Sequence, residues 1–192
     1  MTRLDCRYRL LQLPVPGRAR QRGVTLVELM FTIFIMAVLA MLAIPSWRDA
    51  SLGSRLTATA NSLHGSIQIA RSEAIKTNTP ITLCTSADGE TCSGAGDWDQ
   101  GWIVLRELLD EDGVVIDTDV LHSEPAQTNN FKVVEVGGLT ELTFQPIGVG
   151  ASAATFRVCR EDPVGNQARV VSVTATGIAN VTTIDDGTCP PP

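Results

Sequence analysis

The sequence holds few of the residues on which most catalytic and metal sites depend. It has only two histidines, His64 and His122, and neither stands beside a cysteine. No Cys-x-x-Cys spacing occurs, which disfavours a thiolate metal site. No Gly-x-Ser-x-Gly motif occurs either, so nucleophilic catalysis has no recognisable starting point. We therefore expect a protein that is not an enzyme and that carries no cofactor and no metal.

Positive charge is also scarce outside the first 23 residues. The chain of 192 residues has a net charge of −6. Residues 1–23 carry six arginines against Asp5, a net charge of +5, which leaves −11 for the remainder. Binding to the phosphates of DNA or RNA requires lysine and arginine. Nucleic acid is therefore not an expected partner of the acidic part of the chain.

The chain does contain one long apolar run, at residues 23–47. From Val24 to Ile44 the run spans 21 residues, and about 20 apolar residues are what a helix needs to cross the hydrocarbon of a bilayer. It predicts a transmembrane helix at residues 24–47, preceded by a leader at residues 1–23. Since positive residues that flank a span stay in the cytoplasm, the rest of the chain is expected on the opposite side.

Glu28 lies five residues into this run, where a carboxylate buried towards the middle of the membrane would cost roughly 2.5 kcal/mol or more. The run contains no lysine, arginine or histidine to pair with it. Cleavage after Gly23 would create an α-amine on Val24, one helical turn away. On a neighbouring subunit, that amine could neutralise Glu28 across a helix–helix contact. An ordinary signal anchor with an accidental glutamate is the alternative.

The segment from Arg22 to Glu28 resembles the processing site of type IV prepilins and type II secretion pseudopilins. In that family a membrane peptidase cuts after the glycine and methylates the new amine, and a glutamate at the fifth mature position guides assembly. The resemblance implies cleavage between Gly23 and Val24, N-methylation of Val24 and an assembly contact at Glu28. Pro45 stands where such pilins carry a helix-bending proline.

An amphipathic helix is predicted to follow the span. Apolar residues recur at three- and four-residue steps, and polar residues occupy the other faces. The apolar stripe consists of Leu52, Leu56, Ala60, Leu63, Ile67, Ala70 and Ala74. Pro80 ends the pattern, because the residue before a proline is pushed out of the α region. We place this helix at residues 48–78.

Residues 80–192 have the pattern of an antiparallel sheet, with short β-branched runs separated by Gly, Asp, Asn and Pro. The expected strands lie near residues 81–84, 101–107, 114–122, 131–136, 141–146, 154–160, 168–175 and 178–184. The head at residues 48–192 is thus expected to be α+β, with a long helix packed on an antiparallel β-sheet. Two small sheets or one strongly curled sheet would bury the apolar stripe.

Two further segments narrow the resemblance. Arg71-Ser72-Glu73-Ala74 closes the predicted helix, and Trp98-Asp99-Gln100-Gly101-Trp102 opens a strand. Both resemble the GspH/FimT-type pseudopilins and minor pilins, which have a type IV pilin-like fold. The resemblance implies a structural subunit that primes or caps a type IV pilus or a type II secretion pseudopilus. It also implies a single-pass protein of the bacterial inner membrane with a periplasmic head, whose partners are prepilin peptidase and other major and minor pilins or pseudopilins.

A DNA-uptake or adhesive tip pilin is the alternative function. Some FimT-like minor pilins bind DNA through a C-terminal Gly-Arg-x-Arg segment. The corresponding stretch here is Gly177-Ile178-Ala179-Asn180, in which both arginines are missing. Both a pilus subunit and a secretion subunit fit the motifs.

Two groups of residues have competing interpretations. The carboxylates of residues 110–119 could hold Ca²⁺. The EF-hand spacing fails, however, and Asp112-Gly113 is typical of a hairpin turn. Trp98 and Trp102 could bind a ligand, but paired indoles around a glycine more often close a small core. We favour the hairpin turn and the core.

Of the five cysteines, Cys6 belongs to the leader and would leave on cleavage. The remaining four allow three pairings. Export places them in an oxidising compartment, where disulfides persist. Cys84 and Cys92 flank a short polar loop, and a bond from Cys159 to Cys189 would hold a terminus that otherwise frays. We therefore predict the disulfides Cys84–Cys92 and Cys159–Cys189.

Overall fold

The structure is a computed structural model that describes residues 23–110, 112, 114–128, 130–147, 152–162 and 164–190. The side chains of residues 42–46, 48, 49 and 109 are outside this description. The chain divides into two units, Met1–Ile44 and Pro45–Pro192. Apart from Gly23, the predicted leader lies outside the described residues.

One helix, α1 (Leu26–Thr77), runs from the first unit into the second. Its residues from Leu26 to Met41 are exposed. Among the side chains that the structure describes, no helix holds a stretch long and apolar enough to cross a membrane. The predicted span at residues 24–47 includes residues 42–46, whose side chains are not described.

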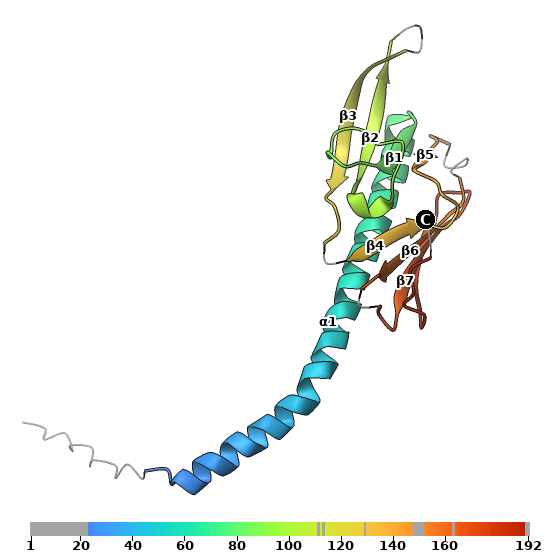
Figure 1. Ribbon diagram of the computed structural model, residues 1–192. Helices are drawn as coiled ribbons and strands as arrows, with labels where there is room; N and C mark the ends of the chain where they lie inside the picture. Colours follow the sequence, from blue (N-terminus) through green and yellow to red (C-terminus); the bar gives the residue numbers. More distant parts are fainter. Residues whose placement is uncertain are drawn as a thin grey trace, which may run out of the picture. The chain divides into compact units, whose positions relative to one another are not determined.

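The described residues of the second unit form eight strands in two antiparallel sheets (Figure 1). The strands are β1 (Ile81–Thr85), β2 (Trp102–Leu109), β3 (Val115–Glu124), β4 (Phe131–Glu135), β5 (Glu141–Phe144), β6 (Ala154–Arg160), β7 (Ala168–Val173) and β8 (Ala179–Ile184). The first sheet has the order β3-β2-β1-β5, and the second has the order β4-β6-β7-β8. A short 3₁₀ helix, η1 (Trp98–Gln100), precedes β2. All eight predicted strands are confirmed, with ends that differ by at most two residues.

The apolar stripe of α1 faces the core, as predicted. Its six members from Leu56 to Ala74 are fully buried, and Leu52 packs at the margin. They share one core with β1, β2 and β5 of the first sheet and with all four strands of the second. One helix face therefore supplies apolar side chains to a main core shared by both sheets. A second, smaller cluster of Cys84, Ile103 and Leu105 is buried on β1 and β2.

The strand pairing within each sheet joins segments that are distant in the sequence. β1 lies between β2 and β5, with Ile81 opposite Phe144. β4 pairs with β6, with Phe131 opposite Arg160. Three connections, from β3 to β4, from β4 to β5 and from β5 to β6, therefore pass from one sheet to the other.

Trp98 and Trp102 belong to the core, which confirms that prediction. Both are at most 1% exposed. Trp98 stacks edge to face on Phe156, with ring centroids 4.9 Å apart, and the indole N–H of Trp102 donates to Ser66 Oγ at 2.9 Å. Gly101 between them has φ +112°, and a Cβ there would lie 2.8 Å from the carbonyl oxygen of Glu124. Glycine is therefore required for the close approach of these chains.

Candidate functional site

The sequence places its first candidate site at the start of α1, around Gly23, Val24 and Glu28. The helix begins at Leu26, and the amide of Glu28 donates to Thr25 Oγ1 at 3.2 Å. This is the N-cap contact expected when a threonine precedes the first turn. Glu28 lies in that turn, where a carboxylate interacts favourably with the helix dipole. A Cβ added at Gly23 would meet nothing within 4 Å.

The first unit exposes apolar side chains on every side of its helix. Leu26, Met30, Phe34 and Met41 are each 64–75% exposed, and the large apolar residues between them are similarly accessible. A helix that is apolar all round is normally surrounded by lipid or by other protein. This surface is therefore of the kind that needs an apolar environment.

Both predicted disulfides are present in the head. Cys84 and Cys92 are bonded with Cα atoms 5.6 Å apart, and Cys159 and Cys189 with Cα atoms 5.5 Å apart. Cys84 lies on β1 and Cys159 on β6, and both are buried. Each bond therefore joins a sheet to a segment outside it.

The loop closed by Cys84 and Cys92 is organised by Asp88. Its Oδ1 accepts from the amides of Glu90 and Thr91, each at 2.8 Å, and from Ser86 Oγ at 2.9 Å. Its Oδ2 accepts from Thr91 Oγ1 at 2.7 Å. These hydrogen bonds, those from Thr91 above all, hold the pKa of the Asp88 carboxyl well below its usual range. The loop is therefore an ordered Asx-type turn.

The C-terminal segment returns to β6. Arg157 Nη2 donates to Asp186 Oδ2 at 2.6 Å, and the bond from Arg157, followed by those from Thr188, lowers the pKa of Asp186 to about 2. A side chain at Gly187 would collide with the backbone of Gly165. The segment is thus held by an ion pair, a close backbone approach and the Cys159–Cys189 bond within four residues of chain.

A buried carboxylate, Glu135, accepts hydrogen bonds from the loop that connects β4 to β5. Its Oε2 accepts from the amides of Gly137 and Leu139 at 2.7 and 2.8 Å, and its Oε1 accepts from the amide of Thr155 at 3.1 Å. Glu135 is 6% exposed. Three amides satisfy the buried oxygens, so the role of this carboxylate is structural.

A cleft of about 520 Å³ lies beside the second disulfide. It is lined by Asp97, Lys132, Val134, Glu161, Val164, Thr188, Cys189 and Pro190. Lys132 Nζ lies 2.8 Å from Asp99 Oδ2, and this hydrogen bond raises the pKa of Lys132. The lysine of the cleft is therefore committed to an ion pair that fastens β4 to η1.

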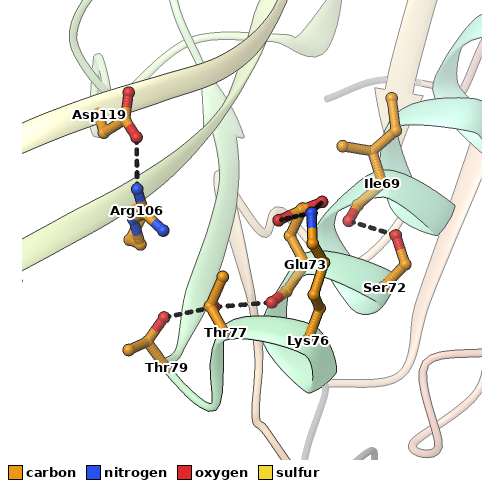
Figure 2. Close-up of polar contacts among 8 residues, drawn as sticks. All are labelled: Ile69, Ser72, Glu73, Lys76, Thr77, Thr79, Arg106 and Asp119. Atoms are coloured by element: carbon orange, nitrogen blue, oxygen red, sulfur yellow. Dashed lines mark hydrogen bonds and ion pairs between the residues drawn. The ribbon is translucent and has the colours of Figure 1, made fainter.

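Figure 2 shows how α1 ends. Lys76 Nζ lies 3.0 Å from Glu73 Oε1, and Thr77 Oγ1 donates to the carbonyl oxygen of Glu73 at 2.7 Å. The hydroxyls of Thr77 and Thr79 share a hydrogen bond at 2.7 Å. Asn78 has φ +54°, a left-handed conformation that stops a helix. The segment from Arg71 to Ala74 therefore leads α1 into a tight turn before β1.

The structure does not bring the remaining candidate residues together. His64 is half-buried on α1 and His122 lies on β3 opposite Val104. Within the described residues, neither histidine side chain forms a hydrogen bond or an ion pair. The part of the chain with described coordinates contains no cluster of His, Cys, Asp or Glu suited to a metal ion. Asp110 lies in the β2–β3 hairpin, where its Oδ1 accepts from two amides. Gly113 of the predicted turn pair is outside the described residues.

Gly177 and Ile178 lie in the turn between β7 and β8, and Ala179 and Asn180 are the first residues of β8. Gly177 has φ +71° and packs against the ring of Phe144, whereas Ile178 is 52% exposed.

Sequence analysis missed the polar groups that organise the loops, Asp88 and Glu135. A signal was present for each. Asp88 stands before Gly89 in a loop bounded by two cysteines, and Glu135 comes shortly before the pair Gly137-Gly138. A carboxylate next to glycines, whose amides are unobstructed, is a frequent cap for a turn.

Two segments of the chain match known protein families. Residues 59–177, more than half of the chain, match the family described as type II transport protein GspH. Residues 18–44 match the prokaryotic N-terminal methylation motif. The matched segments include the residues on which the resemblance to pilins and pseudopilins rests.

Solved structures with a similar fold include a minor pilin in two crystal forms. The type IV minor pilin FimU of Pseudomonas aeruginosa PAO1 is 20% and 21% identical, with a TM-score of 0.50 in both. The matches cover 68% and 69% of this chain and 98% and 95% of FimU. The minor pseudopilin EpsH of the Vibrio cholerae type 2 secretion system is 12% identical, covers 66% of this chain and 94% of its own, and has a TM-score of 0.48. No curated protein matches. At these identities, the likeness to FimU shows a shared fold.

Proposed function

The chain belongs to the GspH family of minor pilins and pseudopilins, and we propose that it primes or caps the assembly of a type IV pilus or a type II secretion pseudopilus. In this proposal, the helix anchors the chain in the bacterial inner membrane as a single span at residues 24–47. The head at residues 48–192 lies in the periplasm. No chemical reaction is part of the function.

One observation carries the proposal: the methylation motif overlaps a helix that exposes apolar side chains on all sides. The motif covers residues 18–44, and the exposed apolar side chains run from Val24 to Met41. At about 25 cal/mol for each Å² of apolar surface, leaving such a helix in water is costly. Lipid before assembly, and neighbouring helices after it, would both provide the apolar surroundings that it needs.

Processing follows from the same arrangement. We propose that prepilin peptidase cuts between Gly23 and Val24 and that the new amine of Val24 is methylated. Glu28 would then contact the amine of an adjacent pilin or pseudopilin. Support comes from the methylation motif and from the N-cap contact that starts the helix three residues after the cut.

The test is mass spectrometry of the assembled fibre fraction and of the membranes that supply it. We expect the mature protein to begin with N-methylated Val24. Gly23→Val should block cleavage and assembly without disturbing the fold, because a Cβ at this position has open space around it. An intact leader in assembled fibres would overturn the proposal.

A further inference from the structure

The hairpin formed by β2 and β3 extends beyond the rest of its sheet. β1 pairs with β2 only from Trp102 to Arg106. The ends of the hairpin, residues 107–109 and 115–118, pair only with each other. We call residues 107–118 the ribbon, of which Glu111 and Gly113 are outside the described residues. In Figure 1 the tips of β2 and β3 project past β1 and β5. A two-stranded ribbon without a covering layer is marginally stable in water.

The ribbon carries apolar side chains that the described residues of the head leave partly exposed. Val114 is 59% exposed, Val115 46% and Ile116 66%, and Leu108 on the opposite strand is 38% exposed. These are β-branched or branched residues, which are typical of strands that pack against another layer. A contiguous group of this kind on a small domain marks an interaction surface.

The outer edge of β3 is also free. β3 is the last strand of the first sheet. Among the described residues, the only strand that pairs with residues 115–124 is β2. A free edge with exposed β-branched residues presents a row of backbone donors and acceptors to which another extended chain can add.

The negative charge of the hairpin restricts which segments can pair with the free edge of β3. Residues 102–124 hold one arginine against seven carboxylates, a net charge of −6. The arginine, Arg106, is already paired with Asp119 at 2.6 Å (Figure 2). Two such hairpins placed edge to edge would put like charges opposite each other, which is destabilising. A second copy of this chain is therefore disfavoured, whereas a segment rich in lysine or arginine is complementary.

We propose that the ribbon docks an extended, basic and apolar segment of a different subunit, which adds as a strand to the free edge of β3. Because successive side chains of a strand point to opposite faces, its positive side chains face Asp117 and its apolar side chains cover Ile116, while Glu107 and Asp112 add to the negative charge of the hairpin. Only the source of the segment, a neighbouring subunit, rests on the proposed function. The arginine-rich leader of this chain is not the occupant, since in the proposed arrangement it lies on the other side of the membrane.

The probe is a synthetic ten-residue peptide in which lysine and valine alternate, added to the full-length protein in detergent micelles. We expect binding that weakens with salt, together with slower amide hydrogen exchange at residues 115–121. A peptide of alternating glutamate and valine, and a lysine–valine peptide with one central proline, should each bind at least tenfold more weakly. The first reverses the charge, and the second cannot complete the strand pairing.

The matched variants change charge by the same amount at two places. The ribbon variant is Glu107→Gln with Asp112→Asn and Asp117→Asn. Its control is Glu141→Gln with Asp162→Asn and Asp185→Asn, exposed carboxylates outside the ribbon whose side chains form no hydrogen bond or ion pair in the described part of the head. We expect the ribbon variant to bind the lysine–valine peptide about tenfold more weakly, and the control to bind it as the parent does.

Several outcomes overturn the inference. One is that the glutamate–valine peptide binds as tightly as the lysine–valine peptide, and another is that both triple variants lose the same amount of affinity. A third is slower hydrogen exchange outside residues 115–121 when the peptide is added. The fourth is a dimer, detected by sedimentation, that the ribbon variant abolishes. The last would make a second copy the occupant. Peptide binding is measured on the isolated protein, so its result does not depend on methylation of Val24. The proposed function is tested separately, by the methylation of Val24.

Discussion

One nitrogen of Arg157, Nη2, donates both to the carboxylate and to the backbone carbonyl of Asp186, at 2.6 and 2.8 Å. The contact joins β6 to the segment that follows β8, 29 positions further along the chain. It lies three residues before Cys189, which is bonded to the same strand. The C-terminal segment is therefore attached to β6 by a charge pair as well as by a covalent bond.

This pair predicts a loss of stability in acid. The pKa of Asp186 is lowered to about 2 in the folded protein, against about 3.9 in an unfolded chain. The carboxylate therefore contributes stability that is fully present above about pH 4 and is lost as the pH falls towards 2. We expect Asp186→Asn to show a smaller fall in Tm over this range than the parent protein. Asp185→Asn is the control, and an equal response of both variants would contradict the assignment.

The two disulfides should differ in their effect on stability. Cys159–Cys189 spans 30 positions and Cys84–Cys92 spans 8. In the chain-entropy description, the longer loop stabilises by roughly 3.5 kcal/mol and the shorter by roughly 2.5 kcal/mol. We expect the paired serine variant of Cys159 and Cys189 to be the less stable of the two in urea titrations. The opposite order would show that the Cys84–Cys92 loop is held mainly by native contacts.

Ser66→Ala should destabilise the head. Its hydroxyl accepts from the indole N–H of Trp102 at 2.9 Å in a fully buried position. The variant leaves that N–H without an acceptor, at a cost of about 1–3 kcal/mol. Ser72→Ala is the matched control, because Ser72 is exposed and bonds only to the carbonyl of Ile69 (Figure 2). Equal midpoints in urea for both variants would argue against a stabilising role of the buried bond.

Glu28→Ala should separate membrane insertion from assembly. Removing a charge from an apolar helix makes insertion at least as favourable, so processing should continue. Incorporation into the fibre, measured by immunoblot of sheared fibres, should fall at least several-fold, because the amine of a neighbour loses its counter-charge. Glu28→Asp keeps the charge and should retain part of the incorporation. Unchanged incorporation of Glu28→Ala would exclude this contact.

The positions of the elements could be predicted because they follow from local patterns. The stripe that includes Leu56 and Ala74 recurs at helical spacing and is buried along its length. Strands such as β4, with Val133 buried and Lys132 only partly buried, follow from alternation. Cys84 and Cys92 could be paired because so little chain separates them.

Strand partners and buried polar contacts could not be predicted in this way. Alternation in β1 does not specify that Ile81 lies opposite Phe144, more than sixty positions away. A charged residue such as Glu135 is expected on the solvent-facing side of a strand. It is buried because the loop that follows folds back over its carboxylate. Likewise, the sequence predicts a hairpin turn at Asp112-Gly113 but not that the hairpin extends past its sheet, since this depends on where β1 ends.

The attachment of Cys189 to Cys159 also determines how the head would bear a mechanical load. A pull on the chain beyond Cys189 is transmitted through the disulfide to β6, which has β4 on one side and β7 on the other. β8, the edge strand that would otherwise peel away first, is outside this path. The backbone bonds of β6 to two neighbours must then break together rather than one after another, so the covalent bond converts unzipping of an edge into shear of an inner strand.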